Sequence, residues 1–284
     1  MSTYMIDDII TRIRTLPPLP DTVHRLLSVV GDPSSSLPQI VDTIRYDQVL
    51  TADVLRLCNS AYFGLSRTIE SLDDAVRLLG TVKVLQLVVA AHARTTLNAP
   101  QTGYGLAPGM LWRHSIGVAL GAQRLARQMR LSQSGVLFTA GLLHDIGKVV
   151  LNEFVANEYV EISRRVVEDH TTFVEAEQDV LGFTHPEVGA RLAESWSLPE
   201  TIVRSIRYHH APDGPETPDP LVDAIHLADS VCISLGIGGG DDGLSYRVNP
   251  DVLARRKLMQ SDLEAIGAEV VAELKSLQAQ LGDK

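Results

Sequence analysis

Residues 140–151 read Ala-Gly-Leu-Leu-His-Asp-Ile-Gly-Lys-Val-Val-Leu, and this segment decides how the whole chain is interpreted. Its apolar residues indicate a buried helical run. His144 and Asp145 stand next to each other within it, and burying two ionisable groups is costly unless a partner compensates them. A metal ion is such a partner. Lys148 shares their predicted helix face, where it pairs with Asp145, holds an anionic substrate or forms a surface salt bridge.

Helical spacing continues outside this segment. Apolar residues recur three or four positions apart at Val23, Leu26, Leu27 and Val30, at Ile40, Val41 and Ile44, and at Val54, Leu57 and Cys58. A hydroxyl residue followed three positions later by Glu or Gln predicts a helix start at Ser36, Thr172, Thr184, Ser197 and Ser261. Alternating strand patterns are hard to find. We therefore predict an all-α fold, a multi-helix bundle preceded by an N-terminal helical layer.

Composition narrows the class of protein. A chain of 284 residues is long enough for one large domain or two modest ones. Its net charge of −10 argues against a nucleic-acid binder, which needs a basic face to neutralise phosphates. Cys58 and Cys232 both stand among apolar residues, which predicts buried thiols rather than a disulfide.

The N-terminal residues 1–14 carry acidic side chains and lack the apolar core of a signal peptide. The longest apolar run, residues 84–91, is broken by Gln86 and is far shorter than the roughly 18 residues that suggest a membrane span. We therefore expect a cytoplasmic protein that binds no membrane.

Two segments rich in glycine interrupt the predicted helices. Residues 98–109 read as a connector between the N-terminal layer and the part of the chain that holds the candidate ligands. Residues 236–243, Gly-Ile-Gly-Gly-Gly-Asp-Asp-Gly, contain no lysine to bind phosphate, so a flexible surface loop is favoured over a phosphate cradle.

Further histidines and an aspartate are spread along the chain in an order that can build a metal site. His185 lies between Thr184, a predicted helix cap, and Pro186, which fixes it at the start of a helix. His209 and His210 end the next predicted helix, where they either ligate a metal or complement the helix dipole. His114 and Asp229 complete the set. Imidazole and carboxylate ligands suit iron, manganese, nickel or zinc.

This order of residues resembles the HD superfamily of metal-dependent phosphohydrolases, whose His, His-Asp and Asp elements match His114, His144-Asp145 and Asp229. The additional His185, His209 and His210 are similar to the extra ligands of the HD-GYP branch, which hydrolyses cyclic dinucleotides. The Gly-Tyr-Pro element of that branch is missing after His210, and this absence argues against the same substrate.

The N-terminal half resembles the HDOD family, regulatory relatives of the HD hydrolases in bacterial signalling. The similarity rests on Leu16-Pro-Pro-Leu-Pro20, on residues 50–61 and on residues 71–80, and it extends over about residues 10–235. It implies a division into an N-terminal helical part (10–98), an HD-like part with the metal site (110–235) and a C-terminal helical extension (236–284).

The two resemblances imply a signal-transduction protein with a binuclear metal site. Asp145 would bridge two ions, with His114, His144 and Asp229 on one and His185, His209 and His210 on the other. The ions would be Fe or Mn, with Ni, Zn or Mg as alternatives. Asp145 and Lys148 would act in phosphohydrolase or phosphodiesterase chemistry, since paired metals activate water and stabilise phosphate-ester oxygens.

A second hypothesis stays open beside this one. The chain is then a non-catalytic signalling or scaffold module that acts through a protein partner, and its metal site is structural or vestigial. The partner under the first hypothesis is a phosphorylated small molecule or nucleotide, and under the second a signalling protein.

Overall fold

The computed structural model describes residues 68–131, 134–240, 246 and 248–281, together with isolated positions between residues 9 and 59. The predicted motif at residues 16–20, the predicted helix start at Ser36 and the two aspartates of the glycine-rich segment lie outside the described residues. Within residues 41–58, the described positions Val41, Ile44, Val54 and Cys58 are helical and buried, as their spacing predicts.

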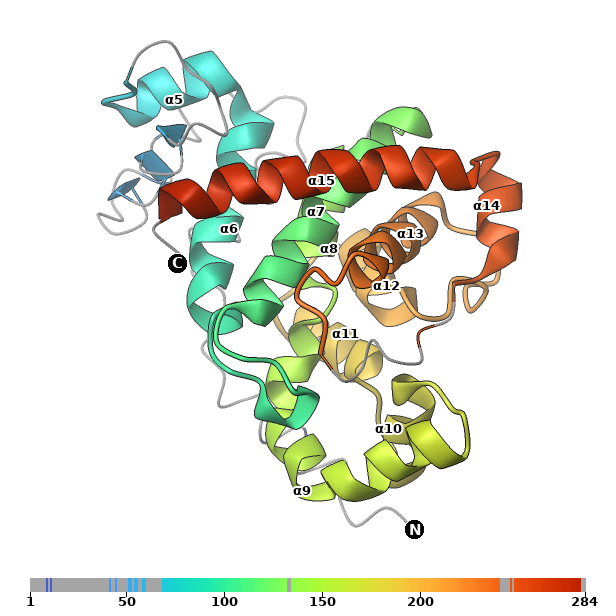
Figure 1. Ribbon diagram of the computed structural model, residues 1–284. Coiled ribbons are helices and arrows are strands. Elements are labelled where there is room, and N and C mark those ends of the chain that lie inside the picture. Colours follow the sequence, from blue (N-terminus) through green and yellow to red (C-terminus); the bar gives the residue numbers. More distant parts are fainter. Residues whose placement is uncertain are drawn as a thin grey trace. The chain divides into compact units, whose positions relative to one another are not determined.

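The chain divides into two compact units, one of residues 1–17 and 96–270 and the other of residues 18–95 and 271–284. The structure describes the following helices, and Figure 1 labels all of them except the short η2. They are α5 (Leu72–Leu79), α6 (Thr81–Leu97), the short 3-10 helix η2 (Thr102–Tyr104), α7 (Met110–Gln128), α8 (Ser134–Leu143), α9 (Ile146–Glu168), α10 (Phe173–Leu181), α11 (His185–Ser195), α12 (Glu200–Tyr208), α13 (Pro220–Ser234), α14 (Pro250–Arg256) and α15 (Gln260–Leu281). The three-part division inferred from the sequence stays a prediction.

The all-α fold class is confirmed over the described residues, which contain a single isolated β-bridge and no strand. Thr172 and Thr184 cap α10 and α11 with complete capping boxes, as predicted. The helices predicted to start at Ser197 and Ser261 are present as α12 and α15, but neither serine is their cap. Ser197 has a left-handed φ of 51° and lies in the turn before α12, and α15 already begins at Gln260.

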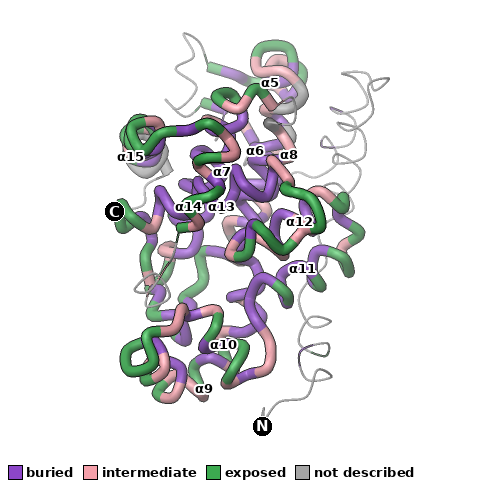
Figure 2. The backbone as a smooth tube through the Cα atoms, turned by 90° about the vertical axis from the view of Figure 1, so that its right-hand side faces the viewer, coloured by how far each residue is buried: buried purple, intermediate pink, exposed green. Residues whose placement is uncertain are grey.

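Small residues let α7 approach its two neighbours closely in the first unit. A Cβ atom on Gly141 of α8 would lie 2.8 Å from the Cα atom of Ala119, and one on Gly121 would lie 3.3 Å from the Cβ atom of Ala228 on α13. Figure 2 shows α7 and α13 almost entirely in the colour of buried residues. Three candidate ligands therefore come together, because α7 carries His114, α13 carries Asp229 and His144 directly follows α8.

A second close crossing joins α9 and α11. A Cβ atom on Gly147 would lie 1.9 Å from the main-chain oxygen of His185 and 2.7 Å from the nitrogen of Gly189. Only glycine allows this contact between main chains. It brings Asp145, which precedes α9, to His185, which begins α11.

The two cysteines of the chain, Cys58 and Cys232, are free and buried, as predicted. Burial raises the pKa of Cys58 to about 11 and that of Cys232 further, so both stay protonated thiols near neutral pH. Among the described helices, none has the length and apolar character needed to cross a membrane.

Helix α14 is attached to α13 through a buried carboxylate. Asp223 is fully buried and pairs with Arg255 and Arg256, each at 2.5 Å, while the two arginines remain about one-fifth exposed. Replacing both arginines with alanine is expected to lower the free energy of unfolding by about 3–5 kcal/mol, because the Asp223 charge is left buried without a partner. Asp223→Ala is expected to cost less, since water reaches both guanidinium groups.

Chemical denaturation of both variants and of the exposed-site control Asp251→Ala tests this order. The same loss of stability in the double arginine variant and in Asp223→Ala would contradict it, because the cost would then come from the lost hydrogen bonds and not from the stranded charge.

Candidate metal centre

Three of the predicted ligands form a buried three-residue group, His114, His144 and Asp229. The Nε2 atom of His114 lies 3.0 Å from Asp229 Oδ1, and that of His144 lies 3.7 Å from the same oxygen. Each residue of the group offers a ligand atom, and these atoms lie within 4.8 Å of one another.

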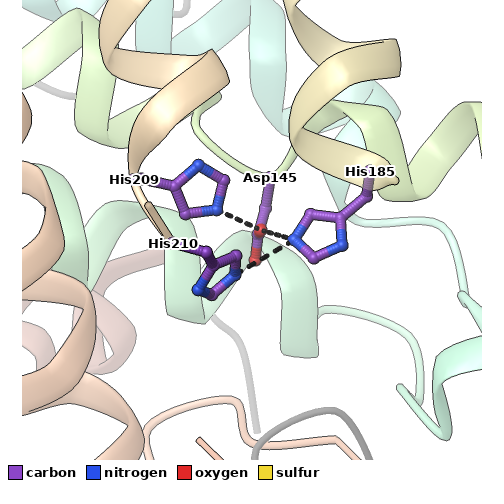
Figure 3. A group of neighbouring side chains, drawn as sticks. All are labelled: Asp145, His185, His209 and His210. Atoms are coloured by element: carbon purple, nitrogen blue, oxygen red, sulfur yellow. Dashed lines mark hydrogen bonds and ion pairs between the residues drawn. The ribbon is translucent and has the colours of Figure 1, made fainter. Parts of the chain in front are cut away.

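The other four predicted ligands, Asp145, His185, His209 and His210, form a four-residue group with the same 4.8 Å spacing. Figure 3 shows His185 and His209 in contact with the carboxylate of Asp145, and His210 in contact with His185. The Nε2 atoms of His185 and His209 lie 3.3 and 3.6 Å from Asp145 Oδ1, and His210 Nε2 lies 3.2 Å from His185 Nε2.

Asp145 touches both groups, because its second oxygen, Oδ2, lies 3.3 Å from His144 Nε2 and 3.6 Å from His114 Nε2. Lys148 donates a 2.6 Å hydrogen bond to the same oxygen and is only 4 % exposed. The surface salt bridge considered for Lys148 is therefore wrong, and the pairing with Asp145 is observed. All seven predicted ligands lie together, in the two groups that the resemblance implies.

The chemistry of the cluster fits a metal. Among the described side chains, five buried atoms of these residues have no hydrogen-bond partner: His144 Nε2, Asp145 Oδ1, His209 Nε2 and both carboxylate oxygens of Asp229. Their contacts are ion-pair distances of 3.0–3.9 Å within the cluster, and a buried polar atom without a hydrogen bond costs about 1–3 kcal/mol. A divalent cation in each group would accept lone pairs from these atoms.

Residues 140–151 do not form the single helical run that the sequence predicts. The helix is interrupted there, since α8 ends at Leu143 and Asp145 is the N-cap of α9. The Asp145 side chain makes no capping hydrogen bond, and it is directed into the cluster instead. His185 begins α11 and His209 directly follows α12, as predicted.

The buried charges change the pKa values of the cluster. Burial alone would lower the pKa of His144, but the charge of Asp145 and the contacts of Nε2 with Asp145 at 3.3 Å and Asp229 at 3.7 Å raise it to about 10. Burial would also lower the pKa of His185, but the charge of Glu177 and the 3.3 Å contact with Asp145 raise it to about 9. Burial lowers the pKa of His209 to about 4. The metal-free cluster therefore holds protons on His144 and His185.

The stability of the metal-free protein is expected to fall as pH rises. The folded pKa values of His144 and His185 lie above the unfolded value of about 6.5, so their contribution is complete below pH 6.5 and is lost as pH passes about 9–10. One such group changes the free energy of unfolding by at most about 1.4 kcal/mol per pH unit. Denaturation between pH 6.5 and 10 measures this slope.

The variant His144→Gln should show a smaller slope, because one of the two titrating groups is removed. The exposed-site control His170→Asn should keep the slope of the wild type. Equal slopes in all three proteins would show that the cluster histidines do not bind extra protons in the folded state.

A cavity of about 620 Å³ opens onto the cluster. Its lining includes Lys148, Arg207, His210 and Asp229, and also the aromatic rings of Phe173 and Tyr246. The two cationic side chains stand beside the carboxylates of Glu175, Glu187 and Asp229, so an anionic ligand would need the charge of bound metal ions as well. The cavity is large enough for a small phosphorylated molecule.

Tyr246 and His226 belong to the site and were missed by the sequence analysis. The Tyr246 ring lies 5.2 Å from the ring of His210, and burial together with the charge of Asp229 keeps the phenol protonated by raising its pKa well above 10. His226 Nδ1 donates to the main-chain oxygen of His209, and its Nε2 accepts from the Asn249 N–H. The local sequence gives no signal for Tyr246.

The described part of the glycine-rich segment, residues 236–240, is a surface loop at the exposed Gly236 and Gly239 but not at the two residues between them. Ile237 and Gly238 are buried, and the Ile237 carbonyl accepts a 3.0 Å hydrogen bond from His114 Nδ1. A Cβ atom on Gly238 would lie 2.4 Å from the main-chain oxygen of Met110, and its φ of +64° also favours glycine. The glycines therefore allow a main chain to pack onto the ligand-bearing helix α7.

Comparison with known proteins finds a family that this chain matches. A model of the HDOD domain matches residues 16–212. The crystal structure of an HDOD domain protein of unknown function from Geobacter sulfurreducens is 30% identical, with a TM-score of 0.76, and covers 98% of this chain and 99% of its own.

Two further proteins are similar. A protein from Shewanella amazonensis SB2B is named as a candidate phosphohydrolase. It is 25% identical with a TM-score of 0.73, and the match covers 96% of this chain and 98% of that one. An uncharacterized protein of Treponema pallidum (strain Nichols) is 27% identical over 232 residues, which are 80% of this chain but only 44% of the relative. The chain thus spans less than half the length of that relative.

Proposed function

Because the chain belongs to the HDOD domain family, we propose that it is a signal-transduction protein whose centre binds two divalent transition metals, Fe or Mn, and hydrolyses a phosphate ester. The observation that carries the proposal is the convergence of five buried atoms without a hydrogen bond, such as those of Asp145 and Asp229, beside a cavity lined by two cationic side chains. The name of the Shewanella protein supports the same chemistry by similarity.

The ligand residues divide between two metal positions that share Asp145. The three-residue group would hold one ion and the four-residue group the other. Bound there, the metals would lower the pKa of water toward about 7 and stabilise both the attacking and the leaving oxygens of the ester.

Side chains around the cavity would bind and orient the ester. Lys148 lies at the cavity wall with its ammonium group on Asp145 Oδ2, from which it can donate to a phosphoryl oxygen as well. Arg207, which also pairs with Glu194, lines the same cavity and would add positive charge beside a phosphate group. The protonated phenol of Tyr246, buried beside Asp229, is a neutral donor for an ester or leaving-group oxygen.

The protein purified without chelators or a metal-affinity tag tests the proposal directly. Elemental analysis is expected to find close to two Fe or Mn ions per chain, and a screen of phosphomonoesters, phosphodiesters and cyclic nucleotides is expected to find one that is hydrolysed. A protein that contains both metals and turns over none of these esters would leave the alternative, a module that acts through a signalling protein partner.

A further inference from the structure

The ligand histidines of the two groups differ in the hydrogen-bond partner of their Nδ1 atoms. Three of them pair with main-chain oxygens: His114 with Ile237 at 3.0 Å, His144 with Gly141 at 2.7 Å and His209 with Ile206 at 2.6 Å. His185 pairs instead with a carboxylate, since its Nδ1 atom lies 2.9 Å from Glu177 Oε2. Among the described ligand histidines, His185 alone has an Nδ1 hydrogen bond to an acidic side chain.

Glu177 is fully buried, and three donors fix its carboxylate. The main-chain N–H of His185 donates to Oε2 at 2.9 Å, in addition to the imidazole of the same residue. The hydroxyl of Tyr104 donates to Oε1 at 2.6 Å, and Tyr104 is itself fully buried in the segment that the sequence suggests is only a connector. Both oxygens of Glu177 thus have defined partners.

We infer that Glu177, held by Tyr104, is a positioning residue that strengthens metal binding by the four-residue group without acting on the three-residue group. A carboxylate at Nδ1 keeps that nitrogen protonated, so that Nε2, 3.3 Å from Asp145 Oδ1, is the nitrogen that would give up its proton and bind the metal. Its negative charge also makes Nε2 a stronger electron-pair donor to a metal ion. A neutral main-chain carbonyl at Nδ1 has a weaker effect of the same kind. The inference rests on the metal centre of the proposed function but not on hydrolysis.

Conservative substitutions separate the effect of the Glu177 charge from the effect of side-chain size. Glu177→Gln keeps the size of the side chain and an acceptor for His185, but removes the charge. Tyr104→Phe removes only the hydroxyl and keeps the ring contact with Phe173, whose centroid lies 5.5 Å away. Asp179→Asn is the matched control, because it removes an equal charge from an exposed position on the same helix, α10.

The experiment is a titration of metal-stripped full-length protein with Mn²⁺ alone, followed by calorimetry and by electron paramagnetic resonance of the bound ions. The wild type and Asp179→Asn are expected to bind two ions. Glu177→Gln is expected to weaken one of the two binding constants by about 10–100-fold and to leave the other within about threefold. Tyr104→Phe is expected to weaken the same constant by a smaller factor.

A double-mutant cycle identifies the affected position. In a His185→Ala background, Glu177→Gln is expected to change Mn²⁺ binding by less than about threefold, because the side chain through which Glu177 acts is gone. A merely structural role would weaken both constants, and would do so in either background. Tyr104→Phe keeps the test decisive if Glu177→Gln does not fold.

Each remaining outcome overturns the inference. It fails if the wild type binds no Mn²⁺, if Glu177→Gln binds like the wild type, or if both constants fall together. Failure of the proposed function is a separate result, since a wild type that binds two ions selectively but hydrolyses no phosphoester would contradict only that proposal.

Discussion

Replacing Asp145 with alanine is expected to remove both metal ions at once and to lower kcat/KM for a phosphoester substrate by about a thousandfold or more. Asp145 is the carboxylate that approaches both groups at 3.3–3.6 Å, with Oδ1 at His185 and His209 and Oδ2 at His114 and His144, whereas Asp229 reaches the four-residue group only through His210 at 3.9 Å. Metal chemistry supplies several kcal/mol of transition-state stabilisation, and each 1.4 kcal/mol is about tenfold in rate. Elemental analysis and steady-state kinetics measure the two effects.

The substitution has a side effect that needs its own control. Lys148 is 4 % exposed and would lose its ion pair with Asp145, and breaking a buried ion pair destabilises by up to about 3–5 kcal/mol. The double variant Asp145→Ala/Lys148→Met removes this penalty, so its metal content reports the ligand role alone. Asp169→Ala, at the exposed C-terminal end of the same helix, should retain both ions. One ion remaining in Asp145→Ala would contradict a shared ligand.

How far the sequence predicts this site depends on the kind of signal at each residue. The positions of His185 and His209 follow from local chemistry, because a cap before proline and a turn after a helix specify helix ends. The grouping of seven dispersed ligands does not follow from local chemistry. It came from the resemblance to HD proteins, and its physical origin is the close crossing of α7 with α8 and α13, which no single segment encodes.

Glu177 shows a signal that was present but not used. Helix α10 buries Phe173, Ala176, Glu177 and Leu181, so Glu177 occupies the stripe that helical periodicity assigns to the core. An acidic residue on such a stripe needs a buried partner, and that partner is a site residue. Tyr246 offers no comparable pattern, because its role depends on where the chain returns after the glycine-rich segment.

Gly147→Ala is expected to destabilise the protein and to impair the four-residue group, although alanine favours a helix over glycine by up to about 1 kcal/mol. The added Cβ atom would lie 1.9 Å from the main-chain oxygen of His185 and 2.7 Å from the nitrogen of Gly189. Main-chain atoms cannot rotate away as a flexible side chain does, so α9 and α11 must separate. Overpacking of this kind costs about 1–3 kcal/mol or more.

The separation acts directly on the metal site, because His185 is the first residue of α11 and Asp145 directly precedes α9. We expect the free energy of unfolding to fall by about 2 kcal/mol or more and the bound metal to fall toward one ion per chain. Gly239→Ala is the matched control, since a Cβ atom there would meet nothing within 4 Å. Denaturation and elemental analysis of both variants give the answer. If Gly147→Ala were as stable as Gly239→Ala and kept two ions, the close crossing of α9 and α11 would not be what holds His185 at Asp145.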